Sequence, residues 1–348
     1  MAGGTGGHIF PGLAVADEMR SAGWEVVWMG GRGGMEERLV PSRGYRTAWI
    51  RARAARGKGL LQKLLLPANL LLSFWESARH ILRLKPDVVL GLGGYVAFPG
   101  GMMASLLNRP LALHEQNAVA GLANRVLAGV SDKVMVAFPG TLKAAEWTGN
   151  PVRAEIAAIA EPEKRFGARR GPIRILVVGG SLGAQALNDA LPKALALLSD
   201  KPQVVHQSGE KHLESLKKNY EKVNVRGELI AFIEDMARRY AEADLVICRA
   251  GAVTVAELSA GGMASVLVPF PHAVDDHQTA NARFLADRGA AILLPQAELT
   301  PERLAGLIGS LGRQKLLEMA RNARALGKPE AARLVARRCM ELAERKAA

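Results

Sequence analysis

Short, continuous apolar segments alternate along this chain with stretches of helical periodicity. Two examples are "DVVLGLGG" at 87–94 and "RILVVGG" at 174–180. Continuous apolar residues, as opposed to alternating ones, are typical of strands buried on both faces of a parallel sheet that helices cover. The pattern therefore predicts an α/β fold with strands at 25–29, 87–92, 110–114, 133–137, 173–178, 203–207, 244–248, 264–268 and 290–294.

Glycine-rich loops introduce two of the helical stretches in the same way. "GGTGGHIFPGLAVADEM" starts at residue 3 and "GGSLGAQALNDALPKAL" at residue 179, and each loop runs into an amphipathic helix. The repeat predicts two Rossmann-like, doubly wound domains at 1–155 and 166–325, in keeping with a length of 348 residues. The joint is expected within 148–172, which is rich in proline, glycine and charge. The last stretch, 326–348, is expected to be either a helix of the second domain or one that packs back on the first.

Composition narrows the class of ligand. The net charge of +13 predicts an anionic partner, whereas 5% aromatic residues without aromatic–basic interleaving speak against nucleic acid. Cys248 and Cys339 match no metal or redox spacing, which indicates a reduced, cytosolic protein. The amino terminus has no signal-peptide pattern, and the leucine-rich segment 60–75 is too short and too interrupted by polar residues to span a bilayer.

The glycine loops are candidate phosphate sites. A glycine loop that opens a helix directs backbone N–H groups and the positive end of the helix dipole toward one point. Such loops occur at 3–7, 91–101 and 179–183, and another begins at Arg249. One loop alone would be interpreted as an ordinary strand–helix turn, but four favour two phosphorylated ligands, one in each domain. The nicotinamide-dinucleotide and P-loop patterns are both absent.

Eight ordered motifs carry a specific resemblance. They are "GGTGGHIFPGLAVA", "KPDVVLGLGGYVAFPG", "LHEQNAVAGLANR", "AFPG", "GNPVR", "RILVVGGSLGAQALN", "CRAGAVTVAEL" and "VPFPHAVDDHQTANA". Together they resemble the MurG family of bacterial cell-wall glycosyltransferases, from Ala2 to about Asn281. The resemblance implies a GT-B fold, in which two Rossmann-like domains enclose an interdomain cleft, with the acceptor on the first domain and the UDP-sugar mainly on the second.

The same resemblance implies an activity and a location. The family's enzymes are hexosyltransferases that move N-acetylglucosamine from UDP-GlcNAc to lipid-linked N-acetylmuramoyl-pentapeptide, converting lipid I to lipid II in peptidoglycan synthesis. They work as peripheral proteins at the cytoplasmic face of the bacterial inner membrane, where other cell-wall enzymes are further partners. Two separately bound substrates suggest one direct displacement with inversion.

Family roles carry over to individual positions. For the donor, the resemblance places Arg153 near the uracil, Ile233 at the uracil through its backbone, Glu257 on the ribose hydroxyls and Gln278 on a sugar hydroxyl. The diphosphate contacts fall on Ser181 and on the backbone of Gly180 and Gly183. In the first half, the residues near the acceptor and the transferred sugar are Thr5, Gly6, Gly7, His8 and Asn117. Glu115 could equally be a structural cap.

The chemistry needs a base for the incoming hydroxyl and stabilisation of the departing diphosphate. No D-x-D motif occurs, so we expect no metal and no cofactor. The helix that starts near Ala252, Val253 and Thr254 can stabilise the leaving group instead. His8 is the leading base, because histidine is the side chain that ordinarily titrates near neutral pH. The alternative is that His8 caps the loop or binds the acceptor phosphate as a cation.

A basic, leucine-rich segment is the candidate membrane contact. Eight basic residues lie between residues 51 and 85 against one acid, Glu76, and an apolar series recurs at helical spacing among them: Leu61, Leu64, Leu65, Leu71, Leu72 and Trp75. The segment from Leu61 to Trp75 with its flanking Lys and Arg predicts binding to anionic lipids of the inner leaflet. The alternative is an amphipathic helix that faces the core.

Two departures from the family keep other functions open. Leu182 stands where relatives commonly have glutamine, and only Met1 and Ala2 precede the first glycine loop, where relatives have a central strand. Three explanations of the second departure are open: the start of the sequence is assigned too late, the chain has been trimmed, or the first sheet tolerates a gap. One alternative is another GT-B UDP-sugar transferase that acts on a membrane lipid. The other is a non-catalytic protein that binds a nucleotide-sugar or anionic lipid.

Overall fold

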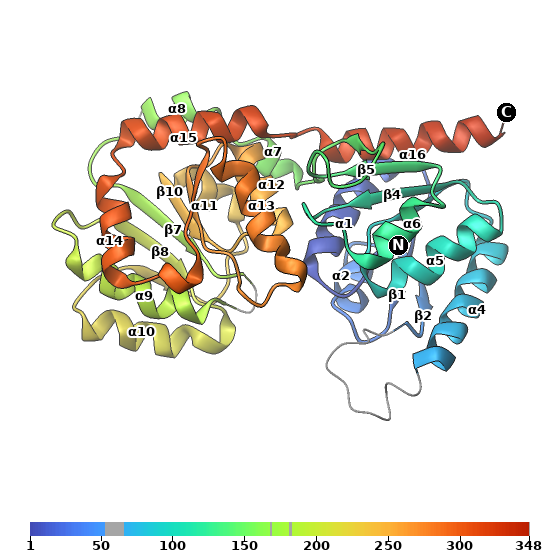
Figure 1. Ribbon diagram of the computed structural model, residues 1–348, viewed down its shortest axis with the longest axis horizontal. Helices are drawn as coiled ribbons and strands as arrows, with labels where there is room; N and C mark the ends of the chain where they lie inside the picture. Colours follow the sequence, from blue (N-terminus) through green and yellow to red (C-terminus); the bar gives the residue numbers. More distant parts are fainter. Residues whose placement is uncertain (53–65, 168, 181–182, 348) are drawn as a thin grey trace. The chain divides into compact units, whose positions relative to one another are not determined.

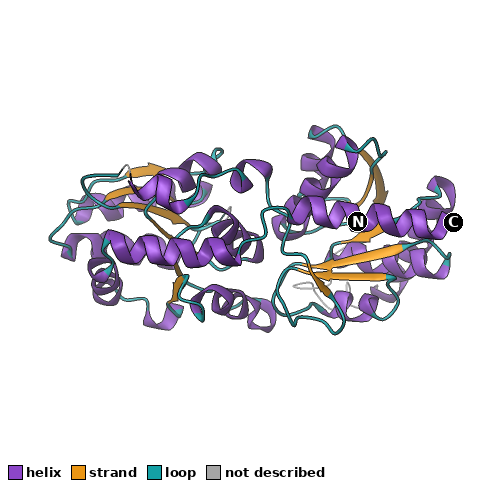
Figure 2. Ribbon diagram, turned by 90° about the horizontal axis from the view of Figure 1, so that it is seen from above, coloured by secondary structure: helices purple, strands orange, loops and turns teal. Residues whose placement is uncertain are grey.

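The computed structural model describes residues 1–52, 66–167, 169–180 and 183–347. The chain forms two compact units. Unit 1 comprises Met1–Arg153 together with Glu330–Ala348, and unit 2 comprises Ala154–Pro329. In each unit, parallel strands form a layer that helices cover (Figures 1 and 2).

Unit 1 holds two groups of parallel strands. The first is β1 (Val27–Gly31) with β2 (Arg46–Ile50), and the second has the order β3 (Val89–Gly91), β4 (Leu111–Glu115), β5 (Lys133–Val136) and β6 (Glu146–Trp147). The helices are α1 (Gly6–Ser21), α2 (Glu36–Ser42), α4 (Leu66–Leu84), α5 (Gly94–Leu106), α6 (Leu122–Ala128) and α16 (Ala331–Ala347). Met1 and Ala2 lie between β1 and β3, because the Met1 nitrogen donates to Leu90 O at 2.7 Å and Trp28 Nε1 donates to Ala2 O at 3.0 Å.

Unit 2 holds one six-stranded parallel sheet. Its order is β12 (Ala291–Leu293), β11 (Ser265–Leu267), β10 (Leu245–Cys248), β7 (Arg174–Val178), β8 (Gln203–Gln207) and β9 (Glu228–Ile230). The helices of eight or more residues are α9 (Gln185–Leu197), α10 (Leu213–Lys222), α12 (Ala252–Gly261), α13 (His277–Ala286), α14 (Pro301–Ser310) and α15 (Arg313–Leu326). Shorter helices are α7 (Ala154–Ala157), α8 (Pro162–Gly167) and α11 (Met236–Glu242).

The strands that the apolar pattern did not predict are β2, β6 and β9. All three lie at the end of their sheet in the strand order. An edge strand has a neighbour on one side only, so its side chains are less completely covered and its sequence is less apolar. The burial of β2 alternates between exposed or half-exposed and buried positions, and β9 has no fully buried residue. Continuous apolarity therefore identified every central strand and overlooked three of the strands at sheet ends, whereas β3 and β12, also at sheet ends, were predicted.

The segment expected to join the domains is partly structured. Residues 154–165, which the sequence placed at or after the end of the first domain, lie in unit 2. Arg165 explains this placement, because its guanidinium is largely buried and donates to Ala160 O at 2.9 Å and to Gly261 O at 3.1 Å. The hydrogen bonds attach α8 to the end of α12.

The last helix, α16, packs on α1 within unit 1 (Figure 1). Val335 and Cys339 are buried in one cluster with Val15 and Met19 of α1. At the helix surface, Arg338 binds the Glu146 carboxylate through Nε at 2.9 Å and Nη2 at 2.8 Å. The carboxyl-terminal residues thus complete the core of the amino-terminal unit.

Candidate functional site

The opening loop of unit 1 is held by a buried carboxylate. Glu36, at the start of α2, is fully buried and accepts hydrogen bonds from Gly4 N at 3.1 Å, Gly31 N at 3.2 Å and Tyr95 Oη at 3.1 Å. These donors come from the glycine loop, the end of β1 and the start of α5. Burial, together with Glu36, raises the pKa of Tyr95 to about 12, so this phenol stays a donor at neutral pH. Glu36 therefore ties three segments together beneath the loop.

The loop after β3 packs directly against the opening loop. Gly94 has φ of +78°, and a Cβ there would collide with the Gly3 carbonyl oxygen. Gly93 has φ of +92°, and its Cβ would lie 3.1 Å from Cε1 of His8. Both positions need glycine for conformation and for space. Thr5 on the same loop is exposed, and Gly6, Gly7 and His8 are half-buried at the start of α1.

His8 stands at the end of a hydrogen-bonded chain. Its Nδ1 lies 2.6 Å from Gln116 Oε1, and Gln116 Nε2 lies 2.8 Å from His114 O and 3.1 Å from His114 Nδ1. His114 Nε2 lies 2.9 Å from the Gly149 carbonyl. His114 and Gln116 are both fully buried.

Two carbonyl groups determine the direction of every bond in this chain. A carbonyl oxygen only accepts, so His114 Nε2 donates to Gly149 O and Gln116 Nε2 donates to His114 O. Burial lowers the pKa of His114 to about 4, so the ring is neutral and its Nδ1 accepts from Gln116. Gln116 Oε1 then accepts from Nδ1–H of His8. In neutral His8 the lone pair is therefore on Nε2.

Glu115 organises the loop that follows β4. Its carboxylate accepts from Asn117 N at 2.8 Å, Gly121 N at 3.2 Å and Asn124 Nδ2 at 2.8 Å. These bonds agree with the structural-cap alternative for this residue. Asn117 is half-buried and directly follows Gln116. The loop that Glu115 stabilises therefore places Asn117 next in sequence to the residue that is hydrogen-bonded to His8.

The predicted donor residues of unit 2 lie on loops and helices that follow the carboxyl ends of its strands. β7, β10 and β11 are adjacent and parallel, so their carboxyl ends meet at the same edge. After β7, Gly180 and Gly183 have φ of +84° and +76°, and the Gly183 amide donates to Gly180 O at 2.9 Å. Ser181 and Leu182 lie outside the described residues.

The loop after β10 leads into α12, which begins at Ala252. The N–H groups of Ala252, Val253 and Thr254 belong to the first turn of this helix, where no intrahelical acceptor exists for them. Glu257 lies one turn further and is largely buried, with Tyr240 Oη donating to its Oε2 at 3.4 Å.

The remaining predicted residues differ in their surroundings. Gln278 accepts from Phe270 N at 2.9 Å through Oε1, so the carboxamide is oriented and Nε2 points away from that backbone. Ile233 has a buried side chain in the segment before α11. Arg153 is half-buried and is the last residue of the first segment of unit 1.

The sequence assigned no role of their own to several neighbouring groups. Asn281, fully buried, donates to Ala250 O at 3.2 Å, and Arg249 donates to Val268 O and Pro269 O, both at 3.1 Å. These bonds hold the loop before α12. Asn281 and Arg249 lie within the motifs quoted above, as Gln116 does in "HEQN". Glu36 lies outside these motifs, and its main partners are backbone amides, which no residue pattern reveals.

The described residues contain no group of three or more His, Cys, Asp or Glu side chains able to hold a metal ion. No helix formed by these residues is both long enough and apolar enough to cross a membrane.

Comparison with known proteins agrees with the two-unit arrangement. The glycosyltransferase family 28 N-terminal domain matches residues 1–136, and the C-terminal domain of the same family matches residues 174–335. The chain is therefore a two-domain glycosyltransferase of family 28 with the GT-B fold.

Individual relatives narrow this class. A protein of Aromatoleum aromaticum is 66% identical over 99% of this chain and 97% of its own length, and one of Azoarcus sp. is 64% identical over 99% and 97%. Both are named UDP-N-acetylglucosamine–N-acetylmuramyl-(pentapeptide) pyrophosphoryl-undecaprenol N-acetylglucosamine transferase. The crystal structure of Acinetobacter baumannii MurG superposes with a TM-score of 0.88, at 44% identity over 98% of both chains. The chain belongs to the MurG family.

Proposed function

We propose that this protein transfers N-acetylglucosamine from UDP-GlcNAc to lipid-linked N-acetylmuramoyl-pentapeptide, the step from lipid I to lipid II. The observation that carries the proposal is the identity of 66% over 99% of the chain to a transferase of that name. Transfer uses the acceptor hydroxyl as nucleophile and UDP as leaving group, in one displacement that inverts the anomeric centre.

His8 is the base in this proposal. The acceptor oxygen forms a bond to C1 of the sugar while the bond from C1 to the β-phosphate oxygen breaks. The proton of the acceptor hydroxyl moves to Nε2 of His8, and the electron pair of the breaking bond leaves with UDP. The chain from His8 through Gln116 to His114 supports this role, because it keeps the resting proton on Nδ1 and leaves Nε2 able to accept.

Unit 2 supplies the donor site in this proposal, apart from Arg153, which belongs to unit 1. The diphosphate binds the loop at Gly180 and Gly183 and the first turn of α12 at 252–254, where N–H groups and the helix dipole stabilise the charge that develops on UDP. Glu257 receives the ribose hydroxyls, and Nε2 of Gln278 donates to a sugar hydroxyl. Uracil contacts Arg153 and the backbone of Ile233.

The described part of the basic, leucine-rich segment supports contact with anionic lipid. On α4, Leu71 is 70% exposed and Trp75 is 60% exposed, whereas Ser77 and Ile81 are buried. Large apolar side chains of this helix therefore face solvent, while a serine is among the buried ones. A helix that served only to cover the core would bury its large apolar side chains instead. Arg79 lies over the Trp75 ring at 5.7 Å, so a cation borders the apolar surface. Leu61, Leu64 and Leu65 lie outside the described residues.

Turnover with a soluble acceptor tests the reaction. The chain is mixed with UDP-GlcNAc labelled in the sugar and a lipid-I analogue with a short prenyl chain, and labelled disaccharide product is separated and counted. Diacylglycerol in detergent serves as the competing acceptor. Binding of UDP-GlcNAc without transfer to either acceptor would contradict the enzymatic proposal, and transfer to diacylglycerol alone would contradict the acceptor.

A further inference from the structure

Gln207 is a buried side chain in unit 2 to which the proposed function assigns no role. It is the last residue of β8, and it is 3% exposed. Its Oε1 accepts no hydrogen bond from the described residues, and its Nε2 donates to Gly180 O at 3.5 Å. Because a carbonyl oxygen only accepts, the Gly180 carbonyl determines which end of the carboxamide is the nitrogen. A buried acceptor without a donor is costly and uncommon in folded proteins.

The glycine loop that follows β7 packs on the end of β8. A Cβ on Gly183 would collide with the Ser208 carbonyl oxygen, so the loop touches the residue next to Gln207. On the other side, Ser208 N donates to Ile230 O of β9 at 2.9 Å. β8 lies between β7 and β9 in the sheet. Gln207 therefore lies between the loop proposed for the diphosphate and the strand that leads to Ile233, the residue proposed for the uracil.

The side chain of Gln207 points away from α9 and α10. The preceding residue, His206, faces these helices, because its ring nitrogens lie 3.0 Å from Asn188 Oδ1 of α9 and 3.1 Å from Tyr220 Oη of α10. Successive residues of a strand point to opposite faces of the sheet. Gln207 therefore belongs to the opposite face.

Helix α11 lies on that opposite face. Glu228 of β9 points to the same side as Gln207, because it lies two residues before the partner of Gln207 in the strand register. The Glu228 carboxylate accepts from Arg239 Nη1 of α11 at 2.9 Å. The next residue of this helix, Tyr240, donates to Glu257 Oε2 at 3.4 Å. Gln207 thus shares a side of the sheet with Glu257, the residue proposed for the ribose hydroxyls.

The Oε1 atom of Gln207 needs a hydrogen, which selects one part of the donor substrate. The oxygens of a diphosphate are acceptors, so they cannot supply this hydrogen. The ribose carries two hydroxyl groups with one hydrogen each, and it joins the diphosphate to the uracil. In the proposed donor site, the ribose therefore lies between the loop after β7 and Ile233, as β8 lies between β7 and β9.

We propose that Gln207 is a further binding residue for the nucleotide, whose Oε1 accepts the hydrogen of one ribose hydroxyl. Glu257 accepts the hydrogen of the other hydroxyl. The 3.5 Å bond to Gly180 O is long, so the carboxamide can shift toward the ligand at little cost. This inference rests on the proposed function, because it takes UDP-GlcNAc as the donor.

Gln207→Met tests the inference because it moves stability and affinity in different directions. Methionine is close to glutamine in length and removes the buried oxygen, and the neighbours of Gln207 in the strand register, Val178 and Ile230, are apolar. The melting temperature is therefore expected to stay the same or to rise. The affinity for UDP, measured by calorimetry, is expected to fall about tenfold. A lower melting temperature together with a lower affinity would indicate a structural role and overturn the proposal.

Gln203→Met is the matched control. Gln203 begins β8, is exposed, and points to the same face as Gln207, since the two residues are four positions apart. The same substitution at this end of the strand should leave the affinity for UDP unchanged. An equal loss of affinity in both variants would overturn the proposal, because the loss would then come from the strand and not from a contact with ribose.

Two analogues identify the hydroxyl group. The parent chain and Gln207→Met are each titrated with UDP, 2′-deoxy-UDP and 3′-deoxy-UDP. The two proteins should differ about tenfold for UDP and for one analogue, but less than about twofold for the analogue that lacks the hydroxyl bound by Gln207. A tenfold difference retained with both analogues would overturn the assignment to ribose. Failure of the proposed function is distinguishable, since the parent chain itself would then not bind UDP.

Discussion

Replacing Gln116 by leucine tests whether the buried chain prepares His8 for catalysis. Leucine has nearly the same size but cannot form the hydrogen bonds to His8 Nδ1, His114 Nδ1 and His114 O. Two buried acceptors on His114 are left without a donor, at about 1–3 kcal/mol each, so unit 1 loses about 2–6 kcal/mol of stability. His8 also loses the group that keeps its proton on Nδ1.

The effect on turnover has an upper limit. General base catalysis contributes about 10²- to 10⁴-fold, which is the loss expected for His8→Ala. Gln116→Leu keeps the His8 imidazole but removes the hydrogen bond that fixes its orientation and its tautomer. We therefore expect kcat to fall by about 10- to 100-fold, within that limit. The affinity for UDP-GlcNAc, measured by calorimetry, should stay unchanged, because the proposed contacts to the diphosphate, the ribose and the sugar lie in unit 2.

A double-mutant cycle separates catalysis from folding. If Gln116 acts through His8, Gln116→Leu lowers kcat no further in the His8→Ala background. The matched control is Asp132→Ala, which removes the bond from Leu111 N at 2.8 Å at the opposite end of β4 and should leave kcat unchanged. A folded Gln116→Leu variant with kcat within about twofold of the parent would refute the reasoning.

Three other outcomes follow from the same structure. Glu36→Gln places an amide group, which itself carries donor hydrogens, among three hydrogen-bond donors. The variant should have a lower melting temperature and a lower kcat, while calorimetry should show that the affinity for UDP-GlcNAc is retained. A normal kcat would contradict a role for the first glycine loop in the reaction. Burial lowers the pKa of His206 from 6.5 to about 3, so its neutral form stabilises unit 2 fully above pH 6.5, and that contribution is lost as the pH falls toward 3. Urea unfolding at pH 5.5 should show a loss of about 1.4 kcal/mol relative to high pH that His206→Gln abolishes; an unchanged pH slope in the variant would exclude this origin. On α4, Leu71→Ser with Trp75→Ser should reduce co-sedimentation with anionic vesicles at least about tenfold, whereas Leu106→Ser, equally exposed on α5, should not; equal effects would argue against a specific patch.

The class of fold could be predicted from the sequence because it depends on local patterns. Apolar runs such as 174–178 are continuous wherever a strand is central and covered on both faces, and glycine loops follow them at the ends of β3 and β7. The same signal overlooked β2, β6 and β9, since edge strands have less apolar surface to bury. The family resemblance, confirmed by relatives that match almost the whole chain, identified the motifs in which the candidate residues lie.

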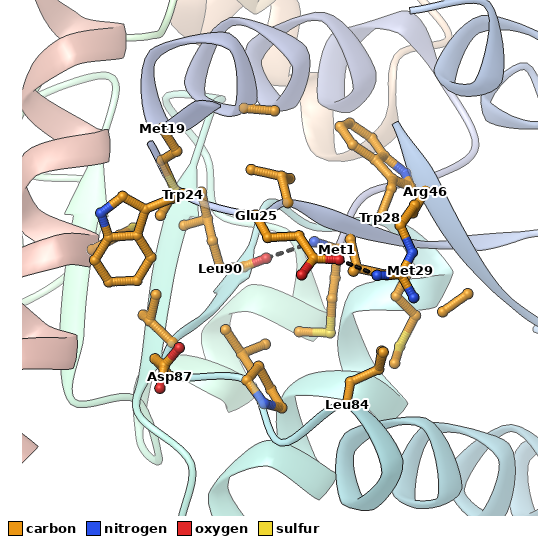
Figure 3. Close-up of a pocket in the computed structure, with 18 of the residues that line it drawn as sticks. Met1, Met19, Trp24, Glu25, Trp28, Met29, Arg46, Leu84, Asp87 and Leu90 are labelled. Carbon is orange, nitrogen blue, oxygen red and sulfur yellow. Dashed lines mark hydrogen bonds and ion pairs between the residues drawn. The ribbon is translucent and has the colours of Figure 1, made fainter. Parts of the chain in front are cut away.

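Only the tertiary structure decided how these residues act on one another. His8 and Gln116 are 108 positions apart, and Glu36 reaches backbone amides whose sequence carries no sign of the contact. The direction of the hydrogen bonds at His8 depends on the Gly149 carbonyl and on the burial of His114, neither of which a motif specifies. Likewise, the sequence by itself indicated that the strand which relatives have before the first glycine loop is missing, whereas the hydrogen bond from Met1 N to Leu90 O of β3 (Figure 3) arises from packing between strands. Residue type and spacing determined which chemical groups are present, and the tertiary structure determined which of them form hydrogen bonds with one another.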